Sequence, residues 1–292
     1  MKIGITADCS SCLDYFPRKH NVKITRTAIH FGDETLIDGV DITADEFYDR
    51  LKNTDIIPTT SAPTPGEIMK RVEEWKAEGC TDIIHFPISF NLSAYGENLQ
   101  AIGKDIFEGV NFYVHNTKAA CIMEGYQAYY AQILAEKGYD VEGILREVEK
   151  LRRNTTAYFV VDDLKYLVKN GRLSAVEGFV GGLVGIKPIL ELSEETDGKI
   201  VPCEKVRTHK KAVNRILELI REKSEGYKRV RYMVQHAGRL EDALELQERV
   251  RKEMPNVEDV EVSVITPTVG AHIGYGLIGL ARIILDDLAE EL

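Results

Sequence analysis

Residues 264–279 read Val-Ile-Thr-Pro-Thr-Val-Gly-Ala-His-Ile-Gly-Tyr-Gly-Leu-Ile-Gly, and they join two segments of different periodicity. Before the glycines, residues 260–265 alternate or run β-branched, which predicts a strand. Residues 277–288 place apolar side chains at helical spacing, which predicts a helix. Residues 264–279 hold four glycines and His272. Glycine permits close backbone approach, and a helix N-terminus offers free N–H groups, so the stretch is a candidate anion site beside a histidine.

The glycines of the same stretch also match a dinucleotide-binding pattern. Gly274, Gly276 and Gly279 spell G-x-G-x-x-G, but a dinucleotide fold needs a further strand and an acidic residue about 20 positions later. Only 13 residues follow Gly279, so we do not expect a nicotinamide dinucleotide here. The glycines could also serve only to shape a turn, and His272 only to bond a backbone partner, because single motifs often match by chance.

The composition is that of an ordinary globular chain and argues against several classes of partner. The 292 residues are 44% hydrophobic and 29% charged, which suits two domains. A net charge of −10 argues against nucleic acid and against an anionic membrane surface. The uncharged stretch from Gly178 to Ile186 is too short to span a bilayer, so no integral membrane association is expected. The first residues are typical of a strand rather than a signal peptide, which favours a cytoplasmic location.

The cysteines predict no disulfide framework. There are five, an odd number, which indicates a reducing compartment. Cys9 and Cys12 form a C-x-x-C, but no second pair or histidine pair accompanies it, so we expect no metal and no cofactor. A redox role stays open, although two small buried residues explain the pair more simply.

Strands alternate with helices over residues 1–155, which predicts a doubly wound parallel sheet. The expected strands are 2–7, 22–31, 35–37, 82–88 and 111–115, and the expected helices are 43–51, 64–77, 93–107 and 119–137. Ligands bind at the carboxyl ends of such strands. Asp8, Thr60, Ser61, Ser89 and Ser93 all fall there, although Ser93 could be only a helix N-cap and Ser61 only a loop hydroxyl.

Residues 156–292 mix hairpins with helices, which predicts an α+β domain with an antiparallel sheet and a C-terminal helix. A hairpin is expected around Asp197-Gly198, between strands 187–192 and 199–207. The other expected strands are 157–161, 229–235 and 257–265. The expected helices, including one that leads into the domain, are 141–153, 163–169, 210–223, 240–253 and 277–288.

Six short segments stand in an order and spacing that is specific in combination. They are Thr6–Ser10, Thr60–Pro65, Ile88–Ser93, Leu164–Ser174, Gly185–Leu190 and Gly270–Gly274. With them the chain resembles the DegV family of two-domain lipid-binding proteins, which includes the fatty-acid-binding subunits of bacterial fatty acid kinase. The resemblance implies a protein that binds a long-chain fatty acid in a tunnel between the domains and is not itself a catalyst.

The resemblance also implies which residues hold the carboxylate: Thr60 or Ser61, Ser93 and His272. The chemistry is suitable, because a buried carboxylate needs donors and each hydrogen bond to a charged group contributes roughly 1.5–3 kcal/mol. An acyl chain adds about 0.8 kcal/mol per buried methylene. The segments expected to line the tunnel are Tyr158–Val161, Phe179–Ile186 and Ile278–Leu280, which could equally be plain core.

A fatty acid kinase catalytic subunit is the partner that the resemblance implies, since in the family's kinase system it phosphorylates the bound carboxylate. Arg172 and Arg207 match arginines that the family uses for partner contact. Simpler interpretations stay open: Arg172 could cap the end of the helix at 163–169, and Arg207 could be a solvated surface charge.

The sequence departs from the family pattern at three places. Ala94-Tyr95 stands where the family usually has Gly-Thr, Tyr275 where it has Pro, and His115-Asn116 where it has Asp-Ser. These departures leave the acyl chain length and the ligand open.

Two enzymatic alternatives are also open. Ser93 and His272 could form a hydrolase, although no G-x-S-x-G elbow surrounds Ser93. A kinase-like enzyme for a small polyol is the other, although the chain has no Gly-rich phosphate loop.

Overall fold

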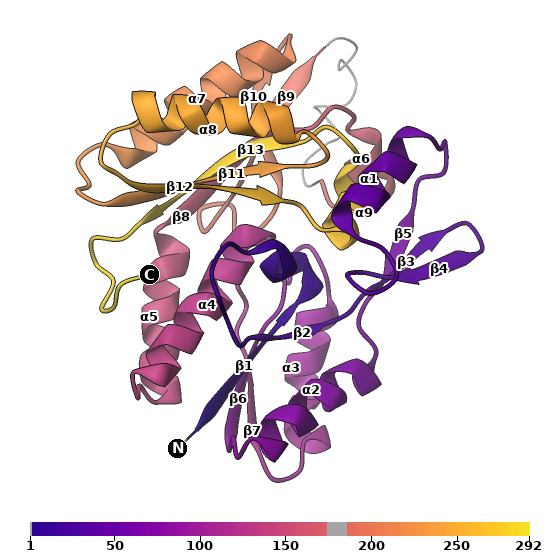
Figure 1. The fold of residues 1–292 in the computed structure, drawn as a ribbon, viewed down its shortest axis with the longest axis vertical. Helices are drawn as coiled ribbons and strands as arrows, with labels where there is room; N and C mark the ends of the chain where they lie inside the picture. Colours follow the sequence, from indigo (N-terminus) through magenta and orange to yellow (C-terminus); the bar gives the residue numbers. More distant parts are fainter. Residues whose placement is uncertain (1, 174–185) are drawn as a thin grey trace.

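The computed structural model describes residues 2–173 and 186–292. The apolar segment Phe179–Ile186, expected to line a tunnel, lies outside the described residues except for Ile186. The two main sheets lie one above the other, with a small third sheet at the side (Figure 1). Within the described ranges, no helix is long and apolar enough to cross a membrane.

The first sheet is parallel throughout, with the strand order β2-β1-β6-β7. Its strands are β1 (Ile3–Asp8), β2 (Lys23–Thr25), β6 (Asp82–Phe86) and β7 (Asn111–Val114). The helices around it are α2 (Pro65–Ala77), α3 (Tyr95–Ile106), α4 (Ile122–Glu136) and α5 (Val141–Arg153). Figure 1 shows α2 and α3 on one side of the sheet and α4 and α5 on the other, so the predicted doubly wound arrangement is confirmed.

Capping signals in the sequence explain where two of the helices begin. Thr43 precedes α1 (Ala44–Lys52), and its hydroxyl accepts from the Glu46 amide while the Glu46 carboxylate accepts from the Thr43 amide. Thr64 precedes α2 and caps the amide of Glu67, with proline at the first helical position. Both groups satisfy N–H donors that would otherwise have no partner in the first turn.

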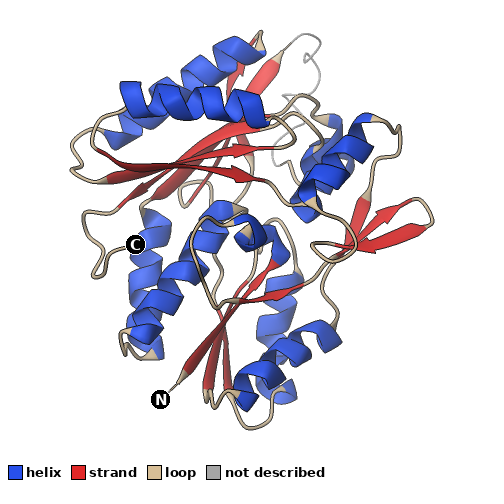
Figure 2. Cartoon of the chain, in the orientation of Figure 1, coloured by secondary structure: helices blue, strands red, loops and turns tan. Residues whose placement is uncertain are grey.

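The second sheet has six strands in the order β10-β9-β8-β13-β11-β12, and only the β11–β12 pair is parallel. Its strands are β8 (Thr155–Val160), β9 (Lys187–Ser193), β10 (Val201–Val206), β11 (Val230–His236), β12 (Val257–Val264) and β13 (Ile278–Ile284). The helices α7 (His209–Ser224) and α8 (Leu240–Glu253) cover its outer face, as Figure 2 shows. The expected antiparallel domain and its hairpin are therefore confirmed.

The predicted C-terminal helix at 277–288 is wrong, because this segment is β13, in the interior of the sheet. Ile278, Leu280 and Ile284 pack toward α7 and α8, whereas Ala281 and Ile283 pack toward the parallel sheet. Every residue of β13 is buried. A strand that is buried on both faces is apolar almost throughout, so its residues also satisfy a helical spacing.

Two further expectations near the small sheet are corrected. Residues 22–31, expected as one strand, form β2 in the parallel sheet and β3 (Ala28–Phe31) in a separate antiparallel sheet. β3 pairs with β4 (Glu34–Ile37) and also with β5 (Thr59–Ser61), which was expected to be a loop. Strand composition does not say which sheet a strand joins, because pairing depends on distant partners.

The inner face of the antiparallel sheet is covered by the other half of the chain. Phe159 and Met233 on this face belong to the same buried cluster as Tyr126 of α4. The Tyr126 hydroxyl also donates to the carboxylate of Glu261 on β12. One continuous core therefore connects both sheets. The predicted division at residue 155 falls where β8 begins and stays a prediction.

Replacing Gly4 by alanine should destabilise the fold. A Cβ at Gly4 would lie 2.5 Å from Cγ of Trp75, whose indole is fixed by donating to the Ile5 carbonyl. Overpacking of this kind costs about 1–3 kcal/mol, to be measured by urea unfolding. Gly66→Ala is the matched control, because the nearest atom to its Cβ lies 3.8 Å away and the residue is exposed in α2. Equal unfolding free energies for Gly4→Ala and Gly66→Ala would contradict this packing.

Candidate functional site

A cavity of about 160 Å³ lies near the carboxyl end of β1, between residues from both halves of the chain. Helix α9 (Pro267–Ile273) forms one wall, and β5, the loop before α3 and the end of α6 (Lys165–Lys169) contribute to the others. Its lining residues are Asp8, Ser10, Thr27, Thr60, Ala62, Pro63, Ile88, Leu92, Ser93, Tyr95, Ala120, Leu167, Arg172, Ile200, Thr268, Val269, His272 and Ile273.

Thr60 and His272 meet inside this cavity. The Oγ1 atom of Thr60 and Nε2 of His272 lie 2.8 Å apart, although 212 positions separate the residues. Thr60 is the middle residue of β5, so its side chain points to the opposite face from those of Thr59 and Ser61. The sequence prediction that Thr60 and His272 share a site is consistent with this geometry.

His272 is a neutral imidazole at neutral pH. Burial, and after it the nearby Arg172 guanidinium, lowers its pKa to about 4. Its Nδ1 atom is buried and has no hydrogen-bond partner among the described residues. The tautomer decides which proton is free: if Nε2–H donates to Thr60, the Thr60 hydroxyl keeps its proton for a ligand, whereas if the Thr60 hydroxyl donates to Nε2, the free N–H is at the buried Nδ1.

Ser93 lines the same cavity from the other half of the chain. Its Oγ accepts from the Tyr95 amide at 3.3 Å, close to the N-cap role that was the simpler interpretation. A hydroxyl that accepts in this way keeps its own proton to donate. Capping and ligand binding are therefore compatible at Ser93.

Ser61 does not line the cavity. It is exposed, and its Oγ lies 2.7 Å from Nε2 of His30 on β3. Of the two hydroxyls left open by the sequence, Thr60 is the one directed at His272. Side chains alternate between the two faces of a strand, so Thr60 and Ser61 point in opposite directions. The sequence did not reveal this difference, because residues 59–61 were expected to form a loop.

Arg172 lines the cavity rather than the outer surface. Its Nε donates to the Leu92 carbonyl at 3.2 Å, and its Nη1 donates to the carbonyl of Asn170, just past the end of α6. The capping role considered from the sequence is therefore present. The guanidinium also brings positive charge to the wall that carries His272.

Arg207 lies elsewhere. It is exposed beyond the end of β10 and lines a shallow surface depression together with Asp162, Lys165 and Lys187. It is not among the described residues that line the cavity.

A buried carboxyl group that the sequence did not single out fixes α9. Asp38 accepts from the amide of Thr268 at 2.8 Å and from its hydroxyl, and burial raises the pKa of Asp38 to about 6. Helix α9 itself was missed, although Thr266 followed by Pro267 is a helix-start signal. The glycines of this stretch predict a loop, and the structure has α9 in its place.

Two glycines of residues 264–279 permit close packing, a role that the simpler interpretation of a turn did not include. Gly274 has a φ of +77°, and a Cβ there would lie 2.6 Å from the Tyr166 ring. Gly270 permits the contact of α9 with Phe47. The anion site expected at the N-terminus of a helix after residue 276 does not form, because β13 follows.

Among the departures from the family pattern, only Tyr95 lines the cavity. Its ring centroid lies 5.9 Å from that of His85 in an edge-on contact. Tyr275 packs instead against Tyr48, and Lys52 lies over its ring. Tyr95 is thus the departure that shapes the site.

The cysteine pair is buried beside the cavity and offers no metal site. Cys9 Sγ lies 3.2 Å from Oγ1 of Thr268, and burial raises the pKa values of both Cys9 and Cys12. A thiol with a raised pKa is a poor nucleophile and a poor metal ligand. Over the described residues, no group of histidine, cysteine and acidic side chains is placed to hold a metal ion.

Comparison with known proteins identifies the family. A family model described as "Uncharacterised protein, DegV family" matches residues 2–284. A DegV domain-containing protein of Staphylococcus aureus is 33% identical over 286 residues, which cover 97% of this chain and 98% of the relative. The chain therefore belongs to the DegV family, and the resemblance drawn from the six sequence segments is confirmed.

Solved structures share the whole fold. A crystal structure of DegV, a fatty acid binding protein from Bacillus subtilis, matches with a TM-score of 0.85 and 30% identity, over 97% of this chain and 99% of that one. The fatty acid kinase B3 protein of Streptococcus pneumoniae, loaded with linoleic acid, has a TM-score of 0.81 over 97% of this chain and all (100%) of that chain. At 21% identity, the second likeness concerns the fold alone.

The lowered pKa of His272 predicts a specific loss of stability in acid. The unfolded chain takes up a proton at this residue near pH 6.5, whereas the folded chain does so only near pH 4. Stability contributed by the neutral imidazole is therefore complete above about pH 6.5 and falls as the pH drops toward 4. Urea unfolding at pH 7 and pH 4.5 should show a smaller loss for His272→Gln than for the natural protein. Equal losses would contradict a buried neutral His272.

Proposed function

We propose that this protein binds a long-chain fatty acid and holds its carboxylate against Thr60, Ser93 and His272. The contact that carries the proposal is the 2.8 Å hydrogen bond between Thr60 and His272 inside a mostly apolar cavity. A polar pair from distant segments, directed into an enclosed space, is typical of a ligand site. The Bacillus subtilis neighbour, described as a fatty acid binding protein, supports the same ligand.

The donors on this wall are sufficient for one carboxylate. When Nε2–H of His272 donates to Thr60, the Thr60 hydroxyl keeps its proton for the ligand, and Ser93 has its hydroxyl proton. Each hydrogen bond to a carboxylate contributes about 1.5–3 kcal/mol when it forms. Two such bonds offset part of the cost of taking the charge out of water.

The charged residues of the lining determine where in the cavity the carboxylate of the ligand lies. Arg172 lies on the wall with His272, so an anion is stabilised there. Asp8 lies on another part of the lining, where its carboxylate accepts from Thr25 at 2.9 Å and from the Ile88 amide at 3.3 Å. Because like charges repel, the carboxylate belongs at the His272 wall and not beside Asp8.

The rest of the lining suits an acyl chain. Its apolar members include Leu92, Leu167, Ile200, Val269 and Ile273. Burial of each methylene contributes about 0.8 kcal/mol, less the cost of ordering the chain. Affinity therefore comes mainly from the chain, while the polar wall selects an acid over an alcohol or ester.

The arrangement does not suit a serine hydrolase. In such enzymes the histidine accepts the serine proton and a carboxylate orients its other nitrogen. Here Nε2 of His272 is paired with Thr60, and no described carboxylate contacts Nδ1. We therefore assign binding, not catalysis, to this cavity.

Presentation of the carboxylate to a fatty acid kinase catalytic subunit is the second part of the proposal. The shared fold with the fatty acid kinase B3 protein of Streptococcus pneumoniae motivates it. We assign Arg207 to contact with the kinase, because it is exposed and outside the cavity, and we assign Arg172 chiefly to the ligand. Five unpaired cysteines are consistent with action in the reducing cytoplasm.

Removing single donors should weaken fatty acid binding without unfolding the protein. Ser93→Ala and His272→Ala should each cost about 1–3 kcal/mol of affinity for oleic acid, measured by calorimetry after delipidation. Ser61→Ala is the control and should bind like the natural protein, because Ser61 faces His30. Native mass spectrometry should also find a long-chain acid that co-purifies. Unchanged affinity in both donor variants would overturn the head-group assignment.

Substitutions of Arg207 and Arg172 should affect different steps, the formation of acyl phosphate and the binding of the fatty acid. Arg207→Ala should keep its affinity for oleic acid but lower the rate of acyl phosphate formation with a cognate kinase. Arg172→Gln should lose affinity itself, because it removes positive charge beside the carboxylate. Arg221→Ala, at a surface arginine paired with Glu253, is the control and should change neither. A natural rate of phosphorylation in Arg207→Ala would remove the docking role from that residue.

A further inference from the structure

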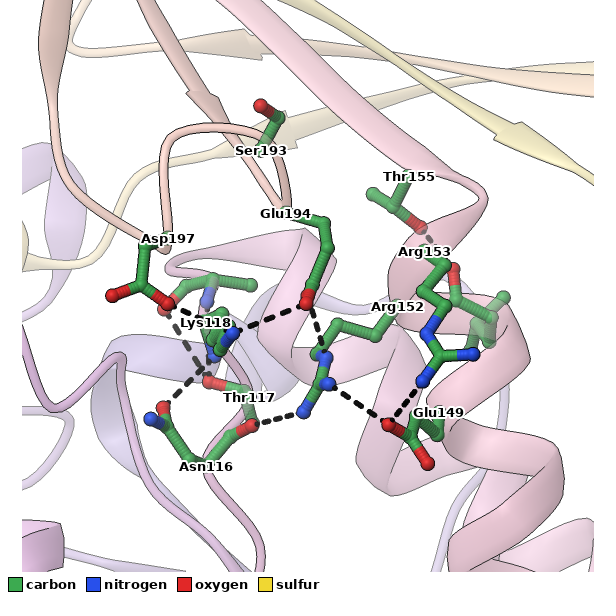
Figure 3. A network of polar contacts seen from close by, with 12 residues as sticks. Asn116, Thr117, Lys118, Glu149, Arg152, Arg153, Thr155, Ser193, Glu194 and Asp197 are labelled. Carbon is green, nitrogen blue, oxygen red and sulfur yellow. Dashed lines mark hydrogen bonds and ion pairs between the residues drawn. The ribbon is translucent and has the colours of Figure 1, made fainter.

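The turn of the β9–β10 hairpin crosses from the antiparallel sheet to the parallel one. Residues 194–198 lie against the loops that follow β6 and β7, and Figure 3 shows the polar contacts of this turn with the loop after β7 and with Arg152 of α5. Nζ of Lys118 lies 3.1 Å from Glu194 and 2.8 Å from Asp197. The Nε atom of Arg152 lies 2.8 Å from the other oxygen of Glu194. One turn thus bridges two cations of the other half of the chain.

The same turn holds the loop that ends in Ser93. The side-chain amide of Asn91 donates to the Asp197 carbonyl at 2.7 Å and to its carboxylate at 3.2 Å. The backbone fits closely as well, because a Cβ at Gly198 would lie 2.7 Å from Cα of Lys118. Asn91 is two residues before Ser93, so the turn positions this part of the cavity wall.

The hairpin turn and the loops that it contacts both lead into residues that line the cavity. Leu92 and Ser93 lie just after Asn91, Ala120 lies two residues after Lys118, and Ile200 lies two residues after Gly198. Separation of the turn from these loops would therefore move Ile200 away from Leu92 and Ser93.

We propose that residues 194–198 form an ionic clasp that positions the Leu92–Ser93 wall and sets the rate at which the ligand leaves the cavity. This inference rests on the proposed function. Lys118 and Glu194 are about a quarter exposed, with side-chain exposures of 23% and 27%, so dissolved ions reach the pair. Salt screens such pairs, and the clasp weakens as ionic strength rises. The acyl chain sets the affinity, while the clasp sets how often the wall opens.

The first test measures release of radiolabelled oleic acid to albumin-coated beads. At about 20 mM salt, Glu194→Gln and Lys118→Gln should release the acid about five- to tenfold faster than the natural protein. Raising the salt to about 500 mM should speed release from the natural protein but not from the variants. Oleyl alcohol should show the same acceleration, because the clasp does not touch the head-group.

Glu195→Gln is the matched control. Glu195 is the neighbour of Glu194 on the same turn, but it pairs with Lys223 of α7 and is 71% exposed. Its variant should release oleic acid at the natural rate. If Glu194→Gln and Lys118→Gln release no faster than Glu195→Gln, the clasp is overturned.

A second measurement separates failure of the clasp from failure of the proposed function. The amides of Leu92 and Ser93 both donate to the Ser89 carbonyl, at 2.9 and 3.0 Å. Their hydrogen exchange without ligand should rise at least about fivefold in Glu194→Gln and stay unchanged in Glu195→Gln. If the natural protein retains no fatty acid, the proposed function fails while faster exchange still supports the clasp. Equal exchange in the two variants overturns the clasp whatever binds.

Discussion

Helices α7 and α8 cover one face of the antiparallel sheet, and the rest of the structure depends on how the other face is covered. Phe159 and Met233 are buried on this face although α7 and α8 lie opposite. A sheet cannot leave such a face in water, so the parallel half must pack on it through α4. The Tyr126–Glu261 hydrogen bond adds a polar constraint to this contact. The cavity is therefore not an accessory pocket, because it lies where the two halves meet.

The sequence predicted much of the fold and of the candidate site, and the predictions that were wrong have a common cause. The resemblance to the DegV family named Thr60 or Ser61 with Ser93 and His272, and of these four residues Thr60, Ser93 and His272 line one cavity. Alternation of strands and helices was also sufficient for the parallel sheet. The helix expected at 277–288 failed because a strand in the middle of a sheet is apolar on both faces. Local patterns report how a residue relates to its neighbours in sequence, whereas the burial of β13 depends on β8 and β11, which are distant in the chain.

Acidic and basic groups near the cavity differ in how burial affects their charge, in a protein whose net charge is −10. Glu124 at the start of α4 is fully buried, and burial raises its pKa well above the usual range while Ser10 donates to it. Burial raises the pKa of Asp38 as well, so these two carboxyl groups are costlier to ionise than they would be in water. Arg172 is the cation at this cavity among the described residues that line it. An acidic protein can thus offer an anion a favourable position, because Arg172 lies on the wall of the cavity that carries His272.

The position of β13 has a consequence for biosynthesis. β8 and β11 are both made before β13, yet they do not pair with each other, and each pairs with β13. The six-stranded sheet therefore cannot close while the ribosome is still translating residues 278–284, and such late, non-local pairing is slow. Thr60 and Ser93 emerge long before His272. A nascent chain that ends before residue 272 carries the hydroxyls without the imidazole, so under the proposed function the wall that holds the carboxylate is incomplete until His272 has been made.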